Sequence, residues 1–263
     1  MDQSFTGFEI IIVDDVSNDK TQEIISQFND TRLRYFRNEH LLGLAASRNR
    51  CLKYARGEFV FFTDADCVVS KNWLNEGLKD LKTKNCLGVE GRTVYISEQY
   101  VPTRSDDIVE NKSGSQYPTC NMAYIKKILD NIGGFYEEFT YLEDRDLALR
   151  VKKIGKILFN PEMLVFHQKK TLGPMQLVRK AKNVRNRVLI YKKLGDKSFF
   201  LGRILYPLNL IAILFPPLIV RNLFSANYKS KADFALFPFI YLSLIYERLN
   251  IWDMSARERV FIL

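Results

Sequence analysis

The sequence has few residues of the types that build metal and redox centres. It contains two histidines and four cysteines, and the cysteines follow one another at intervals of 16, 19 and 34 residues. No pair has the close C-x-x-C spacing of a structural zinc site, and the disulfide framework of a small secreted domain is missing. We therefore expect free thiols in a reducing compartment.

A signal peptide and a broad excess of positive charge are also lacking. The opening residues, MDQSFTGFEI, have neither a basic region nor an apolar region of the secretory type. The formal net charge is +9, but residues 169–203 hold 11 Lys and Arg against one acidic residue, and the rest is close to neutral. Positive charge confined to one segment argues against a general nucleic-acid binder, so we expect no nucleic-acid partner.

What the first half does contain is an alternation of short apolar runs with helical patterns. Strands are predicted at residues 8–15, at 33–36 and after residue 57, with helices at 20–29 and 43–55. This alternation predicts an α/β fold with a doubly wound, mostly parallel sheet. Ligands of such sheets bind beyond the carboxyl ends of the strands, which is where the acidic sequences VDD and DAD lie.

The stretch FVFFTDADCVV at residues 59–69 ends an apolar strand in two carboxylates, Asp64 and Asp66. One residue apart on a strand, both side chains lie on the same side and can converge at its tip. Two close carboxylates repel unless a cation lies beside them, and Mg²⁺ prefers such oxygen ligands together with phosphate. On residue types alone, a solvated loop explains the same pattern.

Two further features could carry chemistry. The segment LEDRDLALRVKKIG predicts a helix whose first turn holds Glu143, Asp144 and Asp146. Crowded carboxylates raise the pKa of at least one of them and prepare a general base, although acids in a first turn also simply complement the helix dipole. His167 ends the apolar strand EMLVFH and could complete a metal site with Asp66, although a lone histidine is more often structural.

The C-terminal third has a different character. Residues 175–191 repeat apolar positions at helical spacing among Lys and Arg, the pattern of a basic helix lying at a membrane interface. Two uncharged, proline-containing runs follow at residues 204–220 and 234–246, both short for a bilayer span. We expect a membrane-associated helical hairpin; the alternative is a helical lid on a soluble core. The polar residues 95–116 predict a loop or an acceptor-side insertion.

Six blocks, taken in order, resemble the glycosyltransferase family 2 enzymes of the GT-A fold. They are FEIIIVDDVSNDKT, LGLAASRN, GEFVFFTDADCVVSKNWL, CNMAYIKKILDNIGGFYEEF, LEDRDLALRVKKIG and VFH. They cover residues 3–167. The resemblance implies an inverting, metal-dependent transfer of a sugar from a nucleoside diphosphate sugar to a hydroxyl acceptor, with a Rossmann-like GT-A fold. An acceptor on a lipid-linked or cell-envelope glycan at the cytoplasmic face of the cell membrane is expected from the basic, apolar C-terminal third.

The resemblance also implies roles for individual residues. The residues implied to bind the sugar donor are Asp15 at the nucleotide base, Arg48 near the donor, and Asp64 at the ribose or a metal-bound water. The implied ligands of Mg²⁺ or Mn²⁺ are Asp66 and His167. The implied general base is Asp144, with Glu143 beside it in the catalytic pair.

The expected organisation is a glycosyltransferase domain at residues 1–168, a basic interfacial helix region at 169–198 and an apolar tail at 199–263. Met1 falls where the family's first strand and helix normally end, so an exposed sheet edge is expected if nothing precedes it. A catalytically impaired binding or scaffold subunit of GT-A type is therefore the alternative function. A nucleotidyltransferase is a third reading, but the chain lacks the usual glycine-rich phosphate loop after a strand. Lys180 in QLVRK, where processive polymerases of the family carry Trp, favours transfer of a single sugar.

Overall fold

The computed structural model describes residues 2–95, 106–107, 109–217 and 235–262. The chain divides into a first unit, Met1–Ile96 with Val109–Gln168, and a second unit, Ser97–Ile108 with Lys169–Leu263. Each unit has its own hydrophobic core. Residues 96–105 and 108 of the predicted polar loop lie outside the described residues.

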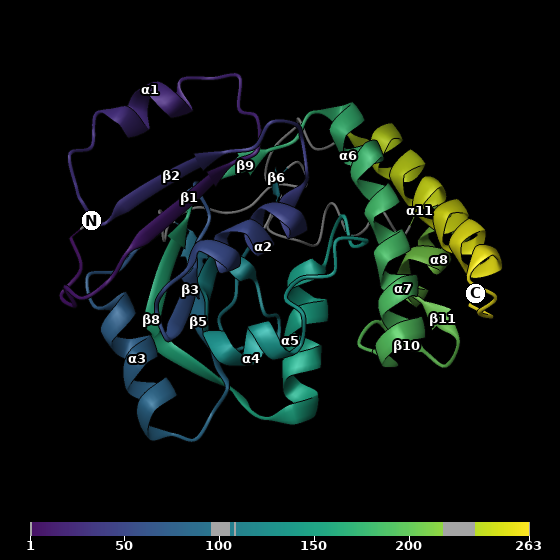
Figure 1. Ribbon diagram of the computed structural model, residues 1–263. Helices are drawn as coiled ribbons and strands as arrows, with labels where there is room; N and C mark the ends of the chain where they lie inside the picture. Colours follow the sequence, from purple (N-terminus) through teal and green to yellow (C-terminus); the bar gives the residue numbers. More distant parts are fainter. Residues whose placement is uncertain (1, 96–105, 108, 218–234, 263) are drawn as a thin grey trace. The chain divides into compact units, whose positions relative to one another are not determined.

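The first unit alternates strands and helices as the sequence predicts (Figure 1). Its elements are β1 Ile10–Asp14, α1 Thr21–Ser26, β2 Leu33–Arg37, α2 Leu44–Tyr54, β3 Phe59–Phe62, β4 Cys67–Val69, α3 Trp73–Thr83, β5 Gly88–Tyr95, the 3-10 turn η1 Thr119–Asn121, β7 Met122–Ile125, α4 Lys126–Asn131, α5 Glu143–Ile154 and β8 Ile157–His167. The helix predicted over LEDRDLALRVKKIG is confirmed as α5, which Gly155 follows.

Two sheets organise this unit. Strands β1 and β2 pair in parallel, while a five-stranded sheet has the order β3-β7-β5-β8-β4. The predicted α/β class is confirmed, and the larger sheet is mixed where the sequence predicted mostly parallel pairing. Among the described residues, the parallel pair in it is β5 with β8; β7 lies antiparallel between β3 and β5, and β4 pairs antiparallel with β8.

Side chains alternate between the two faces of the larger sheet, as the two-residue period of a strand requires. From β7, Met122 and Tyr124 pack with α2, α4 and α5 in one core, while Ala123 packs with α3 in the other. From β3, Phe62 joins the first core and Phe61 the second. The sheet is therefore covered by helices on both faces, and its strand ends are held in fixed places.

A bulge separates the two halves of the β5–β8 ladder. The register shifts between Gly91 and Arg92, opposite the Pro161 region of β8, where a proline cannot donate to a ladder. A Cβ on Gly91 would lie 2.2 Å from the backbone oxygen of Met163, so no larger residue fits without movement. Beyond the bulge the ladder continues to His167, the last residue of β8.

The second unit is a helical bundle with short strands. Its elements are β6 Asp106–Asp107, β9 Lys170–Thr171, α6 Pro174–Lys180, the 3-10 turn η2 Ala181–Val184, α7 Arg185–Leu194, β10 Phe200–Leu201, β11 Ile204–Leu205, α8 Pro207–Leu214 and α11 Phe237–Arg257. Helices α6 and α7 run alongside α11 (Figure 1). Val184 and Val188 are buried there against Ile251 of α11.

This packing bears on the predicted interfacial helix. The helical prediction for residues 175–191 is confirmed by α6, η2 and α7, but Val184 and Val188 of its apolar stripe face protein. The two uncharged runs correspond to β11 with α8 and to the start of α11, while residues 218–234 lie outside the described residues. Among the described helices, none is both long and apolar enough to cross a bilayer.

Candidate active site

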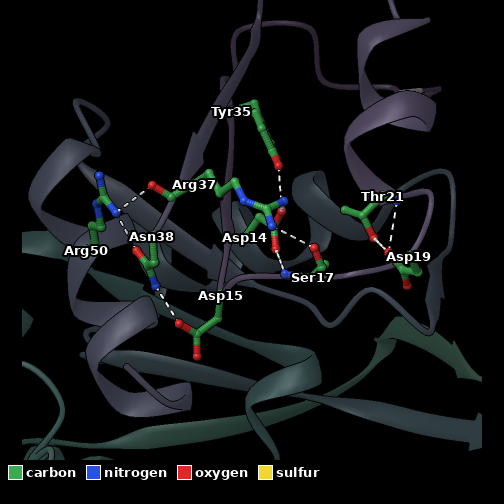
Figure 2. Close-up of polar contacts among 9 residues, drawn as sticks. All are labelled: Asp14, Asp15, Ser17, Asp19, Thr21, Tyr35, Arg37, Asn38 and Arg50. Carbon is green, nitrogen blue, oxygen red and sulfur yellow. Dashed lines mark hydrogen bonds and ion pairs between the residues drawn. The ribbon is translucent and has the colours of Figure 1, made fainter. Parts of the chain in front are cut away.

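The acidic end of β1 is tied to β2 by the first carboxylate of VDD. The side chain of Asp14 is buried and accepts hydrogen bonds from the Tyr35 hydroxyl at 2.6 Å and the Ser17 N–H at 2.7 Å (Figure 2). Arg37 adds an ion pair at 2.9 Å. Burial alone would raise the pKa of Asp14, but these hydrogen bonds and the Arg37 charge outweigh it and lower the pKa. Asp14 therefore holds the strand ends together as a carboxylate.

The second carboxylate, Asp15, lies in a separate network. Its oxygens accept hydrogen bonds from Asn38 Nδ2 at 2.7 Å and from the N–H groups of Leu42 and Gly43 at 2.9 and 2.8 Å. Asn38 also bonds Ser47 on α2, the helix that carries Arg48 (Figure 2 shows Asn38 reaching Asp15). Asp15 thus orders the loop that leads into α2, and its predicted contact with a nucleotide base stays a prediction.

The two acids of DAD lie in a turn. Strand β3 ends at Phe62, before the two acids that the sequence placed at its tip, and the N–H of Cys67 bonds the carbonyl of Asp64 at 3.2 Å. The carboxylates therefore do not share one side of a strand but have different partners. Asp64 pairs with Arg48 at 3.2 Å, and Asp66 faces His167 at 3.6 Å from Oδ1 to Nε2.

The contact between Asp66 and His167 has room for a cation. His167 is 5% exposed, and its Nδ1 lies 2.7 Å from the carbonyl oxygen of Gln168. A carbonyl oxygen only accepts, so Nδ1 carries a proton, and Nε2 is the ring nitrogen that faces Asp66. A proton or a metal ion on Nε2 would satisfy both this nitrogen and the carboxylate, and a backbone carbonyl on the other ring nitrogen is the usual support of a metal-binding histidine. The donor set therefore fits a divalent cation.

Cys67 joins this pair and was missed by the sequence reasoning. Its Sγ lies 3.9 Å from Asp66 Oδ1, and single ligand atoms of Asp66, Cys67 and His167 all lie within 4.8 Å of one another. Cys67 and His167 are direct partners across the antiparallel β4–β8 ladder. They are 100 residues apart in sequence, so spacing gave no signal of this cluster. All four cysteines are free, as expected.

Arg48 links the DAD turn to the acidic first turn of α5. Its guanidinium forms ion pairs with Glu143 through Nη1 and with Asp64 through Nη2. Glu143 is 4% exposed, and the Arg48 side chain is 15% exposed. The structure therefore brings together three residues that the sequence placed in two separate roles, Arg48 and Asp64 at the donor and Glu143 in catalysis.

Asp144 is the residue of this cluster whose acidity changes most. Its carboxylate accepts hydrogen bonds from the N–H of Arg145 at 2.7 Å and of Thr119 at 3.4 Å. Burial, followed by the negative charge of neighbouring Glu143, raises the pKa of Asp144 to about 6. A carboxyl group with this pKa is ionised at neutral pH yet binds a proton far more readily than an ordinary aspartate, which suits a general base.

The third acid of this turn serves the fold instead. Asp146 is fully buried and pairs with Arg150 one turn along α5, at 2.7 Å. Arg150 also donates hydrogen bonds to the carbonyls of Ile132 and Gly134. This network fixes the loop after α4 against α5, so Asp146 does not belong to the reactive cluster.

A buried glutamate organises the backbone next to Asp144. Glu90 of β5 is 2% exposed and accepts hydrogen bonds from three successive N–H groups at residues 115–117 and from the side chain of Asn111. The same loop continues to Thr119, which donates to Asp144. Sequence reasoning missed Glu90, although a charged residue inside the apolar strand GVEGR was a usable signal.

Comparisons with known proteins identify the family and the fold. The sequence model described as "Glycosyl transferase family 2" matches residues 1–138. A curated relative from Escherichia coli, "UDP-Glc:alpha-D-GlcNAc-diphosphoundecaprenol beta-1,3-glucosyltransferase WfaP", is 29% identical over 157 residues, which cover 59% of this chain and 62% of the relative. This chain thus spans about six-tenths of the length of that relative.

Two solved structures share the fold. The crystal structure of TarS residues 1–349 from S. aureus in complex with UDP has a TM-score of 0.57 at 19% identity, covering 99% of this chain and 86% of that one. The mannosyltransferase PcManGT from Pyrobaculum calidifontis, in complex with GDP-Man and Mn²⁺, has a TM-score of 0.57 at 16% identity, covering 96% and 81%. At these identities the likeness shows the fold alone, which is that of GT-A glycosyltransferases. Together with the family match over residues 1–138, the chain belongs to glycosyl transferase family 2.

Proposed function

We propose that this chain transfers a sugar from a nucleoside diphosphate sugar to a hydroxyl group, with inversion at the sugar carbon and dependence on a divalent cation. The observation that carries the proposal is that the DAD turn belongs to two ionic groups: Asp66 faces His167, and Asp64 pairs with Arg48, which also pairs with Glu143 of α5. Candidate cation ligands thus lie in the same turn as an acid that is tied to the helix of the candidate base, as group transfer to a hydroxyl requires.

Asp144 is the proposed base. In this role its carboxylate accepts the proton of the acceptor hydroxyl as the oxygen attacks the sugar, and the diphosphate departs from the opposite side. Its pKa of about 6 keeps it ionised at neutral pH. The N–H groups of Arg145 and Thr119 hold its orientation. Glu143 keeps Arg48 in place and raises the pKa of Asp144 through its charge.

Asp66 and His167 are the proposed ligands of Mg²⁺ or Mn²⁺. When bound, the cation supplies positive charge that stabilises the diphosphate leaving group. The hydrogen bond from Nδ1 of His167 to the Gln168 carbonyl, which directs Nε2 toward Asp66, and the exposed carboxylate of Asp66 support this role. Arg48 adds a fixed positive charge beside Asp64.

For the acceptor we propose a lipid-linked or cell-envelope glycan. The name of the relative WfaP states a diphosphoundecaprenol-linked acceptor, and TarS of Staphylococcus aureus is named a poly(ribitol-phosphate) β-N-acetylglucosaminyltransferase. These names describe those proteins. They support the same class of acceptor here because the WfaP match covers 59% of this chain, and TarS matches this chain in sequence and shares its fold.

We also propose that the second unit binds the cytoplasmic face of the membrane. On α11, Leu242, Tyr246 and Leu249 recur at helical spacing and are 38–53% exposed. On α8, Leu208 and Leu214 are 78% and 66% exposed. Exposed apolar side chains on neighbouring helices, in the unit that also holds the basic residues 169–203, are typical of binding to anionic lipid surfaces.

The reaction is tested by screening purified protein with UDP- and GDP-sugars in the presence of Mn²⁺, using undecaprenyl-diphosphate-linked acceptors. We expect turnover with a subset of donors, loss of turnover with retained donor binding in Asp144→Asn, and loss of both in Asp66→Ala. Asp130→Asn, which changes an exposed surface pair on α4, is the matched control and should keep full activity. Donor binding by the wild type without turnover on any acceptor would instead support the alternative, a binding or scaffold subunit.

Membrane binding is tested by co-sedimentation with phosphatidylglycerol vesicles. The paired change Leu242→Glu with Leu249→Glu should release the protein, whereas Leu41→Glu, at a residue of the first unit that is 77% exposed, should not. Equal binding of all three proteins would contradict the proposed surface.

A further inference from the structure

We propose that Cys67 turns the Asp66–His167 pair into a three-ligand site for a thiophilic divalent cation, Zn²⁺ in particular. The site shares Asp66 and His167 with the proposed Mg²⁺ or Mn²⁺ site. The consequence of zinc binding, competition between Zn²⁺ and these cations, therefore rests on the proposed function. Its binding chemistry stands on the geometry of this chain alone.

Two of the three separations between the ligand atoms are already close to tetrahedral spacing, and the third, between the sulfur and the nitrogen, is within 4.8 Å. Zinc bonds of about 2.0–2.1 Å to N and O and about 2.3 Å to S imply separations of about 3.3 Å between N and O and about 3.6 Å between S and O. The observed separations are 3.6 Å from His167 Nε2 to Asp66 Oδ1 and 3.9 Å from Cys67 Sγ to the same oxygen. Small side-chain rotations close both gaps, and a fourth position is left for water or a phosphate oxygen.

The backbone fixes these ligands before any cation binds. Cys67 and His167 are direct partners in the β4–β8 ladder, so their side chains leave the same face of the sheet. Asp66 lies in the preceding turn, and its carbonyl accepts the N–H of Gln168 at 2.8 Å. Three residues from two strand ends are thus held within 4.8 Å of one another.

The immediate surroundings suit both access and binding. The Asp66 side chain is 46% exposed, which leaves a path for the cation, while His167 is 6% exposed at its side chain and has Nδ1 fixed by Gln168. Buried Cys120 is a neighbour of Cys67 and interacts with it electrostatically.

The sulfur decides which cation binds best. Mg²⁺ and Mn²⁺ prefer oxygen ligands, whereas a thiolate with an imidazole favours Zn²⁺ and Co²⁺. Binding converts the Cys67 thiol to a thiolate and releases its proton to solvent, so charge and atoms balance without any redox partner. Zinc bound in this way would occupy the ligands that the transfer reaction needs.

The test uses Co²⁺ as a spectroscopic substitute for Zn²⁺, and Zn²⁺ itself in competition with a chromogenic chelator. We expect one equivalent of Co²⁺ to give a near-ultraviolet sulfur-to-cobalt charge-transfer band, which Cys67→Ser abolishes and Cys51→Ser retains. Zn²⁺ affinity should fall at least about 100-fold in Cys67→Ser, since even outer contacts of a metal ligand are worth 10–100-fold. Mn²⁺ affinity should change little, because sulfur is a poor ligand for it.

The failures are distinguishable. A charge-transfer band that is missing in the wild type, or that persists in Cys67→Ser with unchanged Zn²⁺ affinity, overturns the zinc site and leaves the proposed transferase untouched. A Cys67-dependent zinc site in a protein that transfers no sugar to any acceptor overturns the proposed function and leaves the site. Thermal unfolding of the two serine variants checks that both are folded, and His167→Gln should lower Zn²⁺ affinity as strongly as Cys67→Ser.

Discussion

The raised pKa of Asp144 has a cost in stability that can be measured without any substrate. An aspartate in the unfolded chain has a pKa of about 3.9, and in the folded chain that of Asp144 is about 6. A difference of about 2 in pKa corresponds to about 3 kcal/mol against the folded state once the group is ionised. We therefore predict that Asp144→Asn stabilises the protein at neutral pH while removing the proposed base.

The sign and the pH window follow from the two pKa values. Below the pKa of Asp144 in the unfolded chain, the residue is protonated in both the folded and the unfolded state and does not reduce the free energy of unfolding. The reduction grows as pH rises from about 4 to about 6 and is constant above that. It amounts to about 1.5 kcal/mol at pH 5 and about 3 kcal/mol at pH 8. Asn offers one acceptor oxygen where the carboxylate serves the N–H groups of Arg145 and Thr119, a loss of about 1 kcal/mol.

The net gain of Asp144→Asn is thus about 0.5 kcal/mol at pH 5 and about 2 kcal/mol at pH 8. The larger value corresponds to a rise in melting temperature of about 4–8 °C for a unit of this size. The growth of the gain with pH is the diagnostic part, because packing changes do not depend on pH in this way.

Urea unfolding followed by tryptophan fluorescence measures this effect in the first unit. The chain has two tryptophans: Trp73 is buried in α3 with its N–H bonded to Asn121, whereas Trp252 on α11 is 47% exposed. In a Trp252→Phe background, Trp73 alone reports the unfolding of the unit that holds Asp144. Asp130→Asn in the same background is the control and should show no pH-dependent gain. A gain in Asp144→Asn that is zero, or equal at pH 5 and pH 8, would refute the reasoning.

Three further changes follow from the same structure. Glu143→Gln removes the charge that helps to raise the pKa of Asp144, so the acidic limb of kcat/KM, expected at about pH 6, should move to lower pH in a pH–rate profile. Glu90→Gln weakens the charge-assisted hydrogen bonds to residues 115–117 and should lower the free energy of unfolding by about 2 kcal/mol, measured with urea. An unchanged unfolding midpoint would contradict this role of Glu90. Gly91→Ala forces a Cβ within 2.2 Å of a backbone oxygen and should cost about 3 kcal/mol or more, unlike Gly7→Ala, whose Cβ would lie 3.4 Å from the nearest atom, an ordinary contact.

Sequence patterns within single segments predicted much of the fold. The runs that predict β1, β2, α2 and α5 depend on periodicity and on breakers within the segment itself, and their ends differ from the structure by a few residues. The pairing of the larger sheet could not be obtained in this way. The segment MAYI that forms β7 has four residues and no useful period, and its place between β3 and β5 is set by contacts distant in sequence.

The residues of the candidate site could also be predicted only in part. The order of motifs indicated Arg48, Asp64, Asp66, Glu143 and His167, and the structure joins them in ion pairs and one close cluster. Residue type and spacing could not predict which acids stabilise the fold and which belong to the candidate site. Asp146 follows Asp144 by two residues, and helical geometry turns it by half a circle to Arg150 and the core.

Periodicity was least informative in residues 175–191. A basic helix with an apolar stripe looks the same whether the stripe meets lipid or protein, since both bury apolar area. Here Val184 and Val188 meet Ile251, whereas Met175 in the same stripe is 55% exposed. The apolar surface that supports the proposed membrane contact lies instead on α8 and α11, outside the segment where the pattern was strongest.

The charges around Arg48 connect the two halves of the proposed chemistry. One guanidinium lies among Asp64, Glu143 and Asp144, so this group of four carries an excess of negative charge when all three acids are ionised. Such an excess can be relieved by a cation at the adjoining DAD turn or by a proton on Asp144, the acid whose pKa is raised. The cation is what a departing diphosphate needs. The proton is the one that an acceptor hydroxyl must lose. A single imbalance, built by placing three acids around one arginine, thus favours both cation binding at Asp66 and proton uptake at Asp144.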